Sequence, residues 1–364
     1  MYFDPRPKTK KADLFDREAE LEQFFDALSY TSLIVIVGLR RSGKTSFMNV
    51  ALAESKHPYI SLDLRGLPYN PSHVDIVRKL ETAFNTVNRK WFTSICDALK
   101  SVKGVSIVGN TISLDWSKAG VDLADIFDKI NAWASKRKER FLVAFDEIQL
   151  IRGDKGIPRL FAHIVDTDHN VILVVTGSEV GLLFDFLGFE DTESPLYGRH
   201  YTEINMQNFD SVNSEAFLRE GFRQIDLVID AGVIDHAVKK LDGVVGWLTL
   251  LGARCRDHNR CTKDMVGKVV VEGGKLARAE ALKLVTLSKR YGVILNFLAR
   301  VGAGSWTQIK AVLEAKEHRS LPNSTVASAL NTLIKTSLIT KIDGQYRLID
   351  PLLMSGIQRD PLPE

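Results

Sequence analysis

The stretch Gly38-Leu39-Arg40-Arg41-Ser42-Gly43-Lys44-Thr45 follows the pattern G-x-x-x-x-G-K-[ST], which encloses the phosphates of a nucleoside triphosphate. An apolar run, residues 33–37, precedes it, and a helical pattern that begins at residue 46 follows it. Strand, glycine loop and helix are the order that this motif requires. The alternative is a glycine-rich turn without a ligand, and the flanking pattern disfavours it.

Each residue type in this loop suits a role in holding phosphate. Gly38 and Gly43 permit turns that aim several N–H groups at one point, and the following helix adds the positive end of its dipole. Lys44 is expected to reach the β- and γ-phosphates, and the hydroxyl of Thr45 to ligate Mg²⁺. The residues expected to contact bound ATP or ADP are Gly38, Leu39, Arg40, Arg41, Ser42, Gly43, Lys44, Thr45 and Ser46.

A second apolar run, residues 141–145 after Arg140, ends in the two carboxylates Asp146 and Glu147. Such a run is typical of a central strand that is buried on both faces of a parallel sheet. At its carboxyl end, Asp146 is placed to hold the magnesium ion, and Glu147 to orient and deprotonate an attacking water. A strand that merely ends in solvated carboxylates is the alternative. The position about 100 residues after the lysine loop disfavours it.

A third apolar run, residues 171–175, ends in Thr176-Gly177-Ser178. Ligands of open α/β sheets bind at the carboxyl ends of the strands, so a hydroxyl here is expected to face the γ-phosphate. Thr176 or Ser178 would then sense phosphate or position water. Either would equally serve as the N-cap of the next helix, and the sequence leaves this choice open.

Together these segments resemble the archaeal ATPase family, within the STAND class of AAA+-related P-loop ATPases. The loop and the Asp-Glu pair are specific only to P-loop ATPases at large. Two further stretches, Phe15-Asp16-Arg17-Glu18 and Tyr197-Gly198-Arg199, narrow the likeness to this family, and Gly243-Val244-Val245-Gly246-Trp247-Leu248 extends it. The resemblance runs from residue 13 to about residue 250, with a C-terminal domain beyond.

The resemblance implies that Phe15 and Arg17 border an adenine pocket and that Arg199 acts near the γ-phosphate, as an arginine finger or sensor. A guanidinium there would stabilise the charge that develops in phosphoryl transfer. An ordinary surface arginine in a loop rich in proline and glycine is the alternative for Arg199. The chain departs from the family at Val245, where the lid motif usually has proline. This substitution puts in doubt any lid–nucleotide contact that depends on a rigid turn there.

The composition sets limits on partners and location. The 48 basic and 45 acidic residues nearly balance, so no overall field demands a nucleic-acid partner. No apolar stretch approaches the roughly 20 residues that span a bilayer, and the N-terminus has charges and prolines where a signal peptide needs an apolar core. We therefore expect a cytoplasmic protein that uses no membrane.

The three cysteines, Cys96, Cys255 and Cys261, form no disulfide framework, consistent with a reducing compartment. Cys255, His258 and Cys261 are residue types that bind zinc. However, their segment looks helical and offers only three ligands, so we favour a structural or incidental role for them.

The predicted fold class is α/β: a P-loop NTPase with an AAA+/ASCE-type parallel sheet flanked by helices, an α-helical lid and a C-terminal winged-helix domain. We expect one helix near residues 17–28, a strand at 59–64, a hairpin that turns at Gly109-Asn110 and a last core strand at 202–206. The predicted boundaries are 1–208 for the core with an insertion at about 66–120, 209–285 for the lid, 286–356 for the winged helix and 357–364 for a tail.

The winged-helix prediction rests on three helical patterns, near 288–301, 305–314 and 323–337, followed by an alternating stretch that turns at Asp343-Gly344. Residues 286–350 hold 9 Lys and Arg against 4 Asp and Glu, which is compatible with phosphate contacts. The candidate recognition helix has no arginine to read guanine, and winged helices also dock proteins. DNA and protein therefore remain equal candidates for its partner.

Two functions follow from these observations. The favoured one is an ATP-binding and ATP-hydrolysing switch of the AAA+/STAND type, coupled to the winged helix. The alternative is a nucleotide-loaded DNA-binding factor, similar to origin-recognition proteins, with little turnover. GTP is disfavoured because the sequence has no Asn-Lys-x-Asp stretch. The candidate catalytic residues are Lys44, Glu147, Thr176, Ser178 and Arg199, and the candidate magnesium ligands are Thr45 and Asp146.

Overall fold

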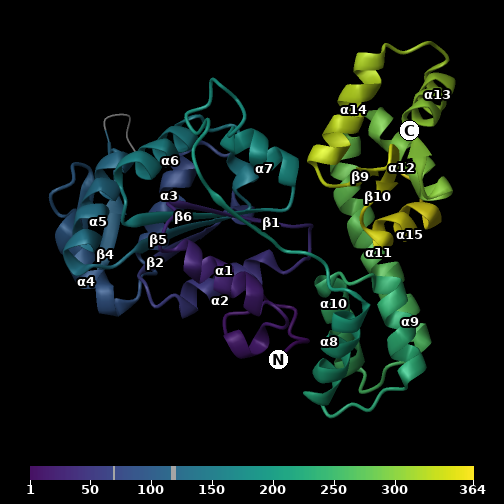
Figure 1. The fold of residues 1–364 in the computed structure, drawn as a ribbon, viewed down its shortest axis with the longest axis horizontal. Coiled ribbons are helices and arrows are strands. Elements are labelled where there is room, and N and C mark those ends of the chain that lie inside the picture. The colour runs from purple at the N-terminus through teal and green to yellow at the C-terminus, as the bar shows by residue number, and fades with distance from the viewer. Residues whose placement is uncertain (69, 116–119) are drawn as a thin grey trace.

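The N-terminal part of the chain is built on a five-stranded parallel sheet in the order β2-β5-β6-β1-β7 (Figure 1). A computed structural model describes residues 1–68, 70–115 and 120–364. The central strands are buried along their whole length because they are runs of apolar, mostly β-branched residues. Because all five strands run parallel, their carboxyl ends meet at one edge of the sheet. The strands are β1 (Leu33–Val37), β2 (Tyr59–Asp63), β5 (Phe141–Asp146), β6 (Val171–Gly177) and β7 (Thr202–Asn205).

Helices cover both faces of this sheet, as predicted (Figure 1). Along β1, Ile34 and Ile36 pack toward α1 and α2, whereas Leu33, Val35 and Val37 pack toward the opposite layer. The first layer consists of α1 (Glu18–Ala27) and α2 (Lys44–Glu54); the second includes α5 (Leu123–Arg137), α6 (Gly156–Thr167) and α7 (Val180–Leu187). Short 3-10 turns follow two strand tips, η2 (Leu64–Gly66) and η3 (Ile148–Ile151), and η1 (Lys11–Asp13) precedes α1.

The insertion between β2 and β5 packs on the second layer and contains the predicted hairpin. Its strands pair antiparallel from Val105↔Leu114 to Val108↔Thr111, so the turn is Gly109-Asn110. Gly109 has a φ of 59°, which glycine adopts without strain. The elements of the insertion are α3 (His73–Phe84), α4 (Arg89–Leu99), β3 (Val105–Val108) and β4 (Thr111–Leu114).

Four helices form the predicted lid, and the winged helix follows it with a three-stranded sheet in the order β8-β10-β9. The lid comprises α8 (Ser211–Arg223), α9 (Ala231–Leu241), α10 (Val245–Asp257) and α11 (Lys263–Val285). The C-terminal part comprises α12 (Lys289–Val301), β8 (Gly304–Ser305), α13 (Trp306–Glu317), α14 (Asn323–Lys335), β9 (Ile339–Ile342), β10 (Gln345–Leu348) and α15 (Pro351–Arg359).

Helix α15 joins the winged helix to the lid. At the crossing of α11 and α15, a Cβ atom on Gly356 would lie 2.2 Å from the carbonyl oxygen of Gly274, so only glycine permits this approach. Lid and winged helix consequently share one apolar core, although the sequence analysis divides them at residue 285. Leu362, within the predicted tail, is also buried in that core. None of the helices in the described part of the chain is both long and apolar enough to cross a membrane.

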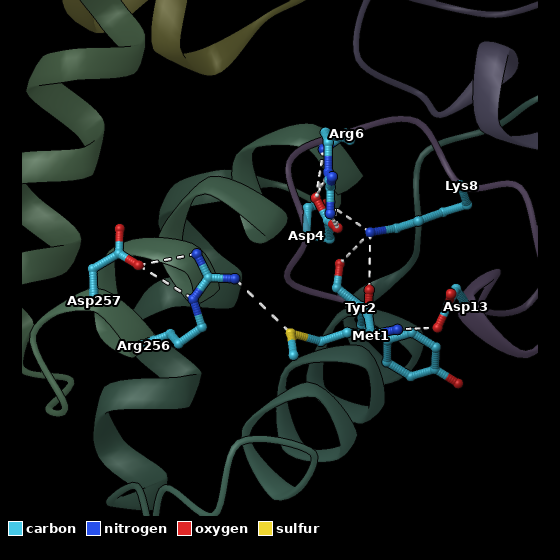
Figure 2. A network of polar contacts seen from close by, with 8 residues as sticks. All are labelled: Met1, Tyr2, Asp4, Arg6, Lys8, Asp13, Arg256 and Asp257. Atoms are coloured by element: carbon cyan, nitrogen blue, oxygen red, sulfur yellow. Dashed lines mark hydrogen bonds and ion pairs between the residues drawn. The ribbon is translucent and has the colours of Figure 1, made fainter.

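Residues 1–8, which we call the N-terminal strap, connect the lid to the core. The ring of Phe3 is fully buried between α8 and α10, where a Cβ atom on Gly221 or Gly252 would lie 2.3 or 2.1 Å from it. Figure 2 shows the strap folded on itself, with the ammonium group of Lys8 donating to the carbonyls of Met1, Tyr2 and Asp4. The Lys8 N–H donates to Ser46 Oγ at 3.0 Å, which fastens the strap to α2.

Candidate functional site

The loop between β1 and α2 has the backbone shape that its glycines predict. Gly38 and Gly43 have φ values of 153° and 93°, and a Cβ atom on Gly38 would lie 2.6 Å from the carbonyl oxygen of Met206. Since α2 begins at Lys44, the free N–H groups of its first turn face the loop. These donors, together with the helix dipole, form a site for an anion.

Lys44 is buried inside this loop. Its Nζ donates to the carbonyl oxygens of Gly38 at 2.8 Å and Leu39 at 2.7 Å. Burial lowers the pKa of Lys44 to about 8, although the neighbouring carboxylates Glu147 and Asp146 act in the opposite direction. The ammonium group is therefore the positive centre of the loop near neutral pH.

Asp146, the last residue of β5, bonds the start of α2 and the tip of β6. Its Oδ2 accepts a hydrogen bond from Thr45 Oγ1 at 2.8 Å, and its Oδ1 accepts one from Thr176 Oγ1 at 2.6 Å. Burial raises the pKa of Asp146, and the two hydroxyl groups offset only part of this effect. Thr45 and Asp146 thus present adjacent oxygen donors, the ligand type that Mg²⁺ prefers, and these residues fit a magnesium ion.

Glu147 is held from one side only. Ser178 Oγ, the Ser178 N–H and Gln149 Nε2 donate to its Oε2 at 2.8, 3.0 and 2.6 Å. Burial alone would raise the pKa of Glu147, but the Lys44 ammonium group and these hydrogen bonds outweigh it and lower the pKa. The carboxylate therefore stays ionised. Among the described residues, none donates to Oε1.

The two strand-tip hydroxyl groups have different positions. Thr176 Oγ1 donates to Asp146 and accepts the Glu147 N–H at 3.0 Å, whereas Ser178 bonds Glu147. The N-cap alternative is not observed for either, because α7 begins after Glu179 and no side chain caps it. Thr176 thus orients the candidate metal ligand, and Ser178 the candidate base.

A cavity of about 430 Å³ extends from the loop between the lid and the strap. Its volume lies within the range of about 300–1,000 Å³ that is usual for small-molecule sites. Phe15 and Arg17, the two residues expected at the adenine pocket, both line it. The ring of Phe15 meets those of Phe209 and Phe217 edge to face at 5.6 Å, and the Arg17 guanidinium lies 4.7 Å from the centre of the Phe209 ring.

Several residues that line the cavity escaped the sequence analysis. Arg65, in η2, lies with Nη2 3.2 Å from Asp146 Oδ2, and a search for polar residues after every core strand would have found it. The strap and the lid give no comparable local signal, because only tertiary packing brings them here. The other unexpected lining residues are Tyr2, Asp4, Pro5, Arg6, Pro7, Lys8, Asp13, Leu14, Met206, Phe209, Phe217, Thr249, Leu250 and Leu276.

The two loop arginines bind the lid. Arg41 donates to Glu280 of α11 at 2.6 and 3.1 Å and lies 4.1 Å over the ring of Trp247. Arg40 pairs with Glu179 at 2.7 Å and with Glu280 at 3.4 Å. Carboxylates therefore engage both guanidinium groups, and the contact of Arg40 and Arg41 with nucleotide stays a prediction.

The lid motif also touches the loop, despite the valine at position 245. The N–H of Gly246 donates to the carbonyl oxygen of Arg41 at 3.0 Å. A Cβ atom on Gly246 would lie 2.6 Å from Arg41 Cβ, and one on Gly43 would lie 3.4 Å from Val245 Cγ1. The backbone of Gly246, rather than a proline ring, therefore provides the contact.

Arg199 is not among the residues that line this cavity, and its action near a γ-phosphate stays a prediction. Its Nε and Nη2 donate to the carboxylate of Asp166 at 2.8 and 2.6 Å. Asp166 lies near the end of α6, just before β6 begins, and Arg199 lies just before β7. Both residues are therefore at the amino edge of the sheet, a strand's length from the loop.

Cys255 and Cys261 lie close together, and their contact raises the pKa of the buried Cys255 thiol. In the described part of the chain, His258 does not join them in a group of three potential metal ligands. This arrangement agrees with the incidental role favoured above.

Comparisons with known proteins agree with this geometry. Residues 14–250 match the model of an ATPase domain predominantly from Archaea, and residues 286–349 match that of the MCM protein C-terminal winged helix-turn-helix domain. The structure of a Walker-type ATPase of Pyrococcus abyssi is similar, with a TM-score of 0.85, 31% identity, and 98% of this chain and 100% of that chain covered.

The structure of the Aeropyrum pernix ORC2 protein, described in ADPNP–ADP complexes, has a TM-score of 0.63 at 13% identity. The match covers 98% of this chain and 96% of that one. At this identity the likeness concerns the fold alone. A search of curated proteins returned no match.

Proposed function

The chain belongs to the family of ATPase domains found predominantly in Archaea, and from this premise we propose that it is a magnesium-dependent ATP-hydrolysing switch of the STAND type. The observation that carries the proposal is one bonded network at the carboxyl edge of the sheet. It runs from Thr45 through Asp146 and Thr176 to Glu147 and Ser178, beside the buried Lys44. The network faces a cavity between core and lid.

In this proposal, the loop N–H groups and Lys44 bind the β- and γ-phosphates. Thr45 and Asp146 would hold Mg²⁺, which when bound neutralises phosphate charge and aligns the oxygens for transfer. Thr176 fixes the carboxylate of Asp146 through its hydroxyl group. The adenine and ribose would occupy the part of the cavity that Phe15, Arg17 and the strap line.

Glu147 is the proposed base or water-orienting group. Because Ser178 and Gln149 both donate to Oε2, they fix the direction of the carboxylate and leave Oε1 to accept a proton from water. The lowered pKa keeps Glu147 ionised at neutral pH, as this role requires.

The switch would act through the contacts between loop and lid. Arg41 and Arg40 bind Glu280, and Trp247 Nε1 donates to Asp350 Oδ1 at 3.3 Å, ahead of α15. Since lid and winged helix share one core, a movement of α10 and α11 would carry the winged helix with it.

The winged helix also contacts the core directly, close to the catalytic residues. Lys335 of α14 pairs with Asp185 of α7 at 2.6 Å, and Ser337 Oγ accepts the Val180 N–H at 3.2 Å. A Cβ atom on Gly181 would lie 2.6 Å from the Cα of Lys335. This surface lies directly after Ser178 and Glu179, so a nucleotide-dependent shift there would reach α14.

The experiment that tests this function is steady-state phosphate release by the wild type and Glu147→Gln. We expect hydrolysis to fall by at least about 100-fold, because the general base is lost, while ATP binding persists. Equal rates in the two proteins would show that Glu147 is not the base. Gln149→Ala serves as the comparison variant, since it removes one support of Glu147 but not the carboxylate.

A second candidate function, a nucleotide-loaded DNA-binding factor, is supported by the winged helix itself. Lys335, at the end of the candidate recognition helix α14, and Lys341, on β9, are exposed cations, and Asp185 pairs with the first. If DNA binds here, Asp185→Asn will strengthen low-salt duplex binding, and Lys335→Ala with Lys341→Ala will abolish it. No DNA binding at low salt, with or without ATP, would favour a protein partner.

A further inference from the structure

A second cluster of potential ligands lies at the opposite edge of the sheet from the nucleotide loop. It consists of Asp128 on α5, His163 on α6 and Asp168, which follows α6 directly. One ligand atom from each lies within 4.8 Å of the other two, and His163 Nε2 is 2.7 Å from Asp128 Oδ1. The proposed ATPase function uses none of these residues.

Asp168 is the unusual member of this cluster. Its side chain is 1% exposed, and its Oδ2 has no hydrogen-bond partner in the described part of the chain. Two backbone hydrogen bonds hold Asp168 in place. Its N–H donates to the carbonyl oxygen of Ile164 at 2.9 Å, at the end of α6, and its carbonyl oxygen accepts the Val171 N–H at 2.8 Å. A buried carboxylate oxygen without a partner costs free energy unless a cation compensates it.

No lysine or arginine compensates this charge among residues 1–68, 70–115 and 120–364. The guanidinium group of Arg199 donates two hydrogen bonds to the carboxylate of Asp166, not to that of Asp168. The only ionisable nitrogen on the cluster is the half-exposed imidazole of His163. The site therefore carries two carboxylates and one imidazole, with access from solvent through Asp128 and His163.

We propose that Asp128, His163 and Asp168 bind a divalent transition-metal ion of the Zn²⁺ class. Zinc accepts both histidine nitrogen and carboxylate oxygen, and three protein ligands with a water molecule complete its tetrahedral shell. Magnesium and calcium prefer oxygen ligands alone, so the imidazole selects against them. The ion would join α5 to α6 at the point where β6 begins.

The outer contacts of the site suit this role. Asn131 Oδ1 accepts hydrogen bonds from the N–H of Asn170 at 2.9 Å and from its Nδ2 at 3.0 Å. These bonds fix the turn that follows Asp168 to α5, three residues after Asp128. Such surrounding bonds orient the ligands of metal sites.

The test uses the full-length chain without an affinity tag, freed of metal by chelation and then titrated calorimetrically with ZnCl₂. We expect one tight Zn²⁺ per chain, and at least a tenfold weaker site in His163→Gln, Asp168→Asn and Asp128→Asn. His73→Gln is the matched control: His73 pairs with Asp154 at 3.1 Å, but no third ligand from the described residues joins them. This variant should bind zinc like the wild type.

Two further variants locate the bound ion. Zinc binding should persist in Asp146→Asn and in Cys255→Ser with Cys261→Ser, which alter the nucleotide site and the thiol pair. In the wild type, Co²⁺ should give visible ligand-field bands, and these should disappear in His163→Gln. Because His163 is half exposed, this variant remains informative even if Asp168→Asn does not fold.

Thermal unfolding gives an independent readout, because a ligand that binds only the folded state raises the melting temperature. Zinc should raise it in the wild type and in His73→Gln, but not in His163→Gln. The proposal is overturned if the wild type binds no stoichiometric Zn²⁺, or if His163→Gln and Asp168→Asn bind it unchanged. In that case a proton shared between His163 and the two carboxylates accounts for the cluster.

Discussion

The two ends of the nucleotide cavity are built in different ways. The phosphate end comes from short segments at strand tips of one sheet, and its polar groups are bonded to one another. The other end combines aromatic and apolar side chains with the charged groups of the strap and Arg17, and it is assembled from the strap, the segment before α1 and the lid. There the backbone N–H of Tyr2 donates to Gln224 Oε1 at 2.8 Å, across 222 residues of sequence.

The two ends should therefore have separate roles: hydrolysis at the phosphate end, and coupling of nucleotide binding to lid position at the other end. The sheet edge is a rigid frame, so substitutions there should remove catalysis whatever the lid does. The other end, where adenine would bind, lies between core and lid. Substitutions there should change affinity and lid position while the catalytic groups stay in place. Substitutions at the two ends should therefore differ in which kinetic constant they change.

Lys44→Ala should abolish function at the phosphate end. The variant removes the buried positive centre of the loop, and we expect hydrolysis to fall by about 100- to 1,000-fold, as for other preorganised donors. ATP binding, measured by calorimetry, should fall in parallel. Lys56→Ala, at the far end of α2, should leave both unchanged. If Lys44→Ala retains activity, the loop does not bind the triphosphate as proposed.

Phe3→Ala should weaken ATP binding at the adenine end without changing catalysis. Without the ring between Gly221 and Gly252, the strap loses its anchor in the lid. We expect the Kd for ATP to rise about tenfold, or about 1.4 kcal/mol, with kcat at saturating ATP within a factor of two. Tyr30→Ala, an exposed aromatic residue at the end of α1, is the control. A large loss of kcat in Phe3→Ala would contradict the separation of the two ends.

The same contrast explains what the sequence could predict. The phosphate end was predictable, because the loop and the tips at Asp146 and Thr176 are each continuous in sequence and follow buried strands. Helix α15 has a local signal too, since Asp350 and Pro351 form a helix start, whereas the sequence analysis predicts no helix after the wing. The strap and Glu280 carry no local signal, because their partners lie some 200 residues away.

Arg199 shows a different limit. Because it directly precedes a predicted strand of a parallel sheet, its position at the amino edge follows from the sequence. Its ion pair with Asp166, 33 residues earlier in the chain, does not. Sequence pattern gives the order of the elements, whereas such pairs between loops follow only from their packing.

Affinity for ATP should depend on pH through the phosphate end. Burial lowers the pKa of Lys44 to about 8, so in the free protein the ammonium group loses its proton as the pH rises through that value. A neutral amine attracts phosphate less, and bound phosphate favours the protonated form. We therefore expect affinity to fall about tenfold between pH 7 and pH 9, with proton uptake on binding near pH 9.

Calorimetry in buffers of different ionisation enthalpy measures that uptake. Lys44→Arg, whose guanidinium group stays charged throughout this range, is the control and should flatten the profile. A flat profile in the wild type would mean that Lys44 keeps its proton to higher pH than its burial implies.

Glu280→Gln should have the smallest effect, because it breaks contacts between loop and lid without touching the catalytic groups. Glu280 bonds Arg41 at 2.6 Å and Arg40 at 3.4 Å, and all three side chains are partly exposed. Such pairs contribute up to about 1 kcal/mol, so we expect at most a fivefold change in kcat or Kd. The amides of α10 should nevertheless exchange faster with solvent, since Gly246 and Trp247 pack on Arg41.

The matched control for Glu280→Gln is Glu272→Gln on the same helix. Glu272 pairs with Arg254 of α10, so its bond lies within the lid and does not reach the loop. If nucleotide state is transmitted through the loop–lid contacts, ATP should protect α10 from exchange in the wild type and in Glu272→Gln, but less in Glu280→Gln. If the two variants respond alike, the signal does not pass through Arg40 and Arg41. The direct contact between α7 and α14 would then be the route from the nucleotide to the winged helix.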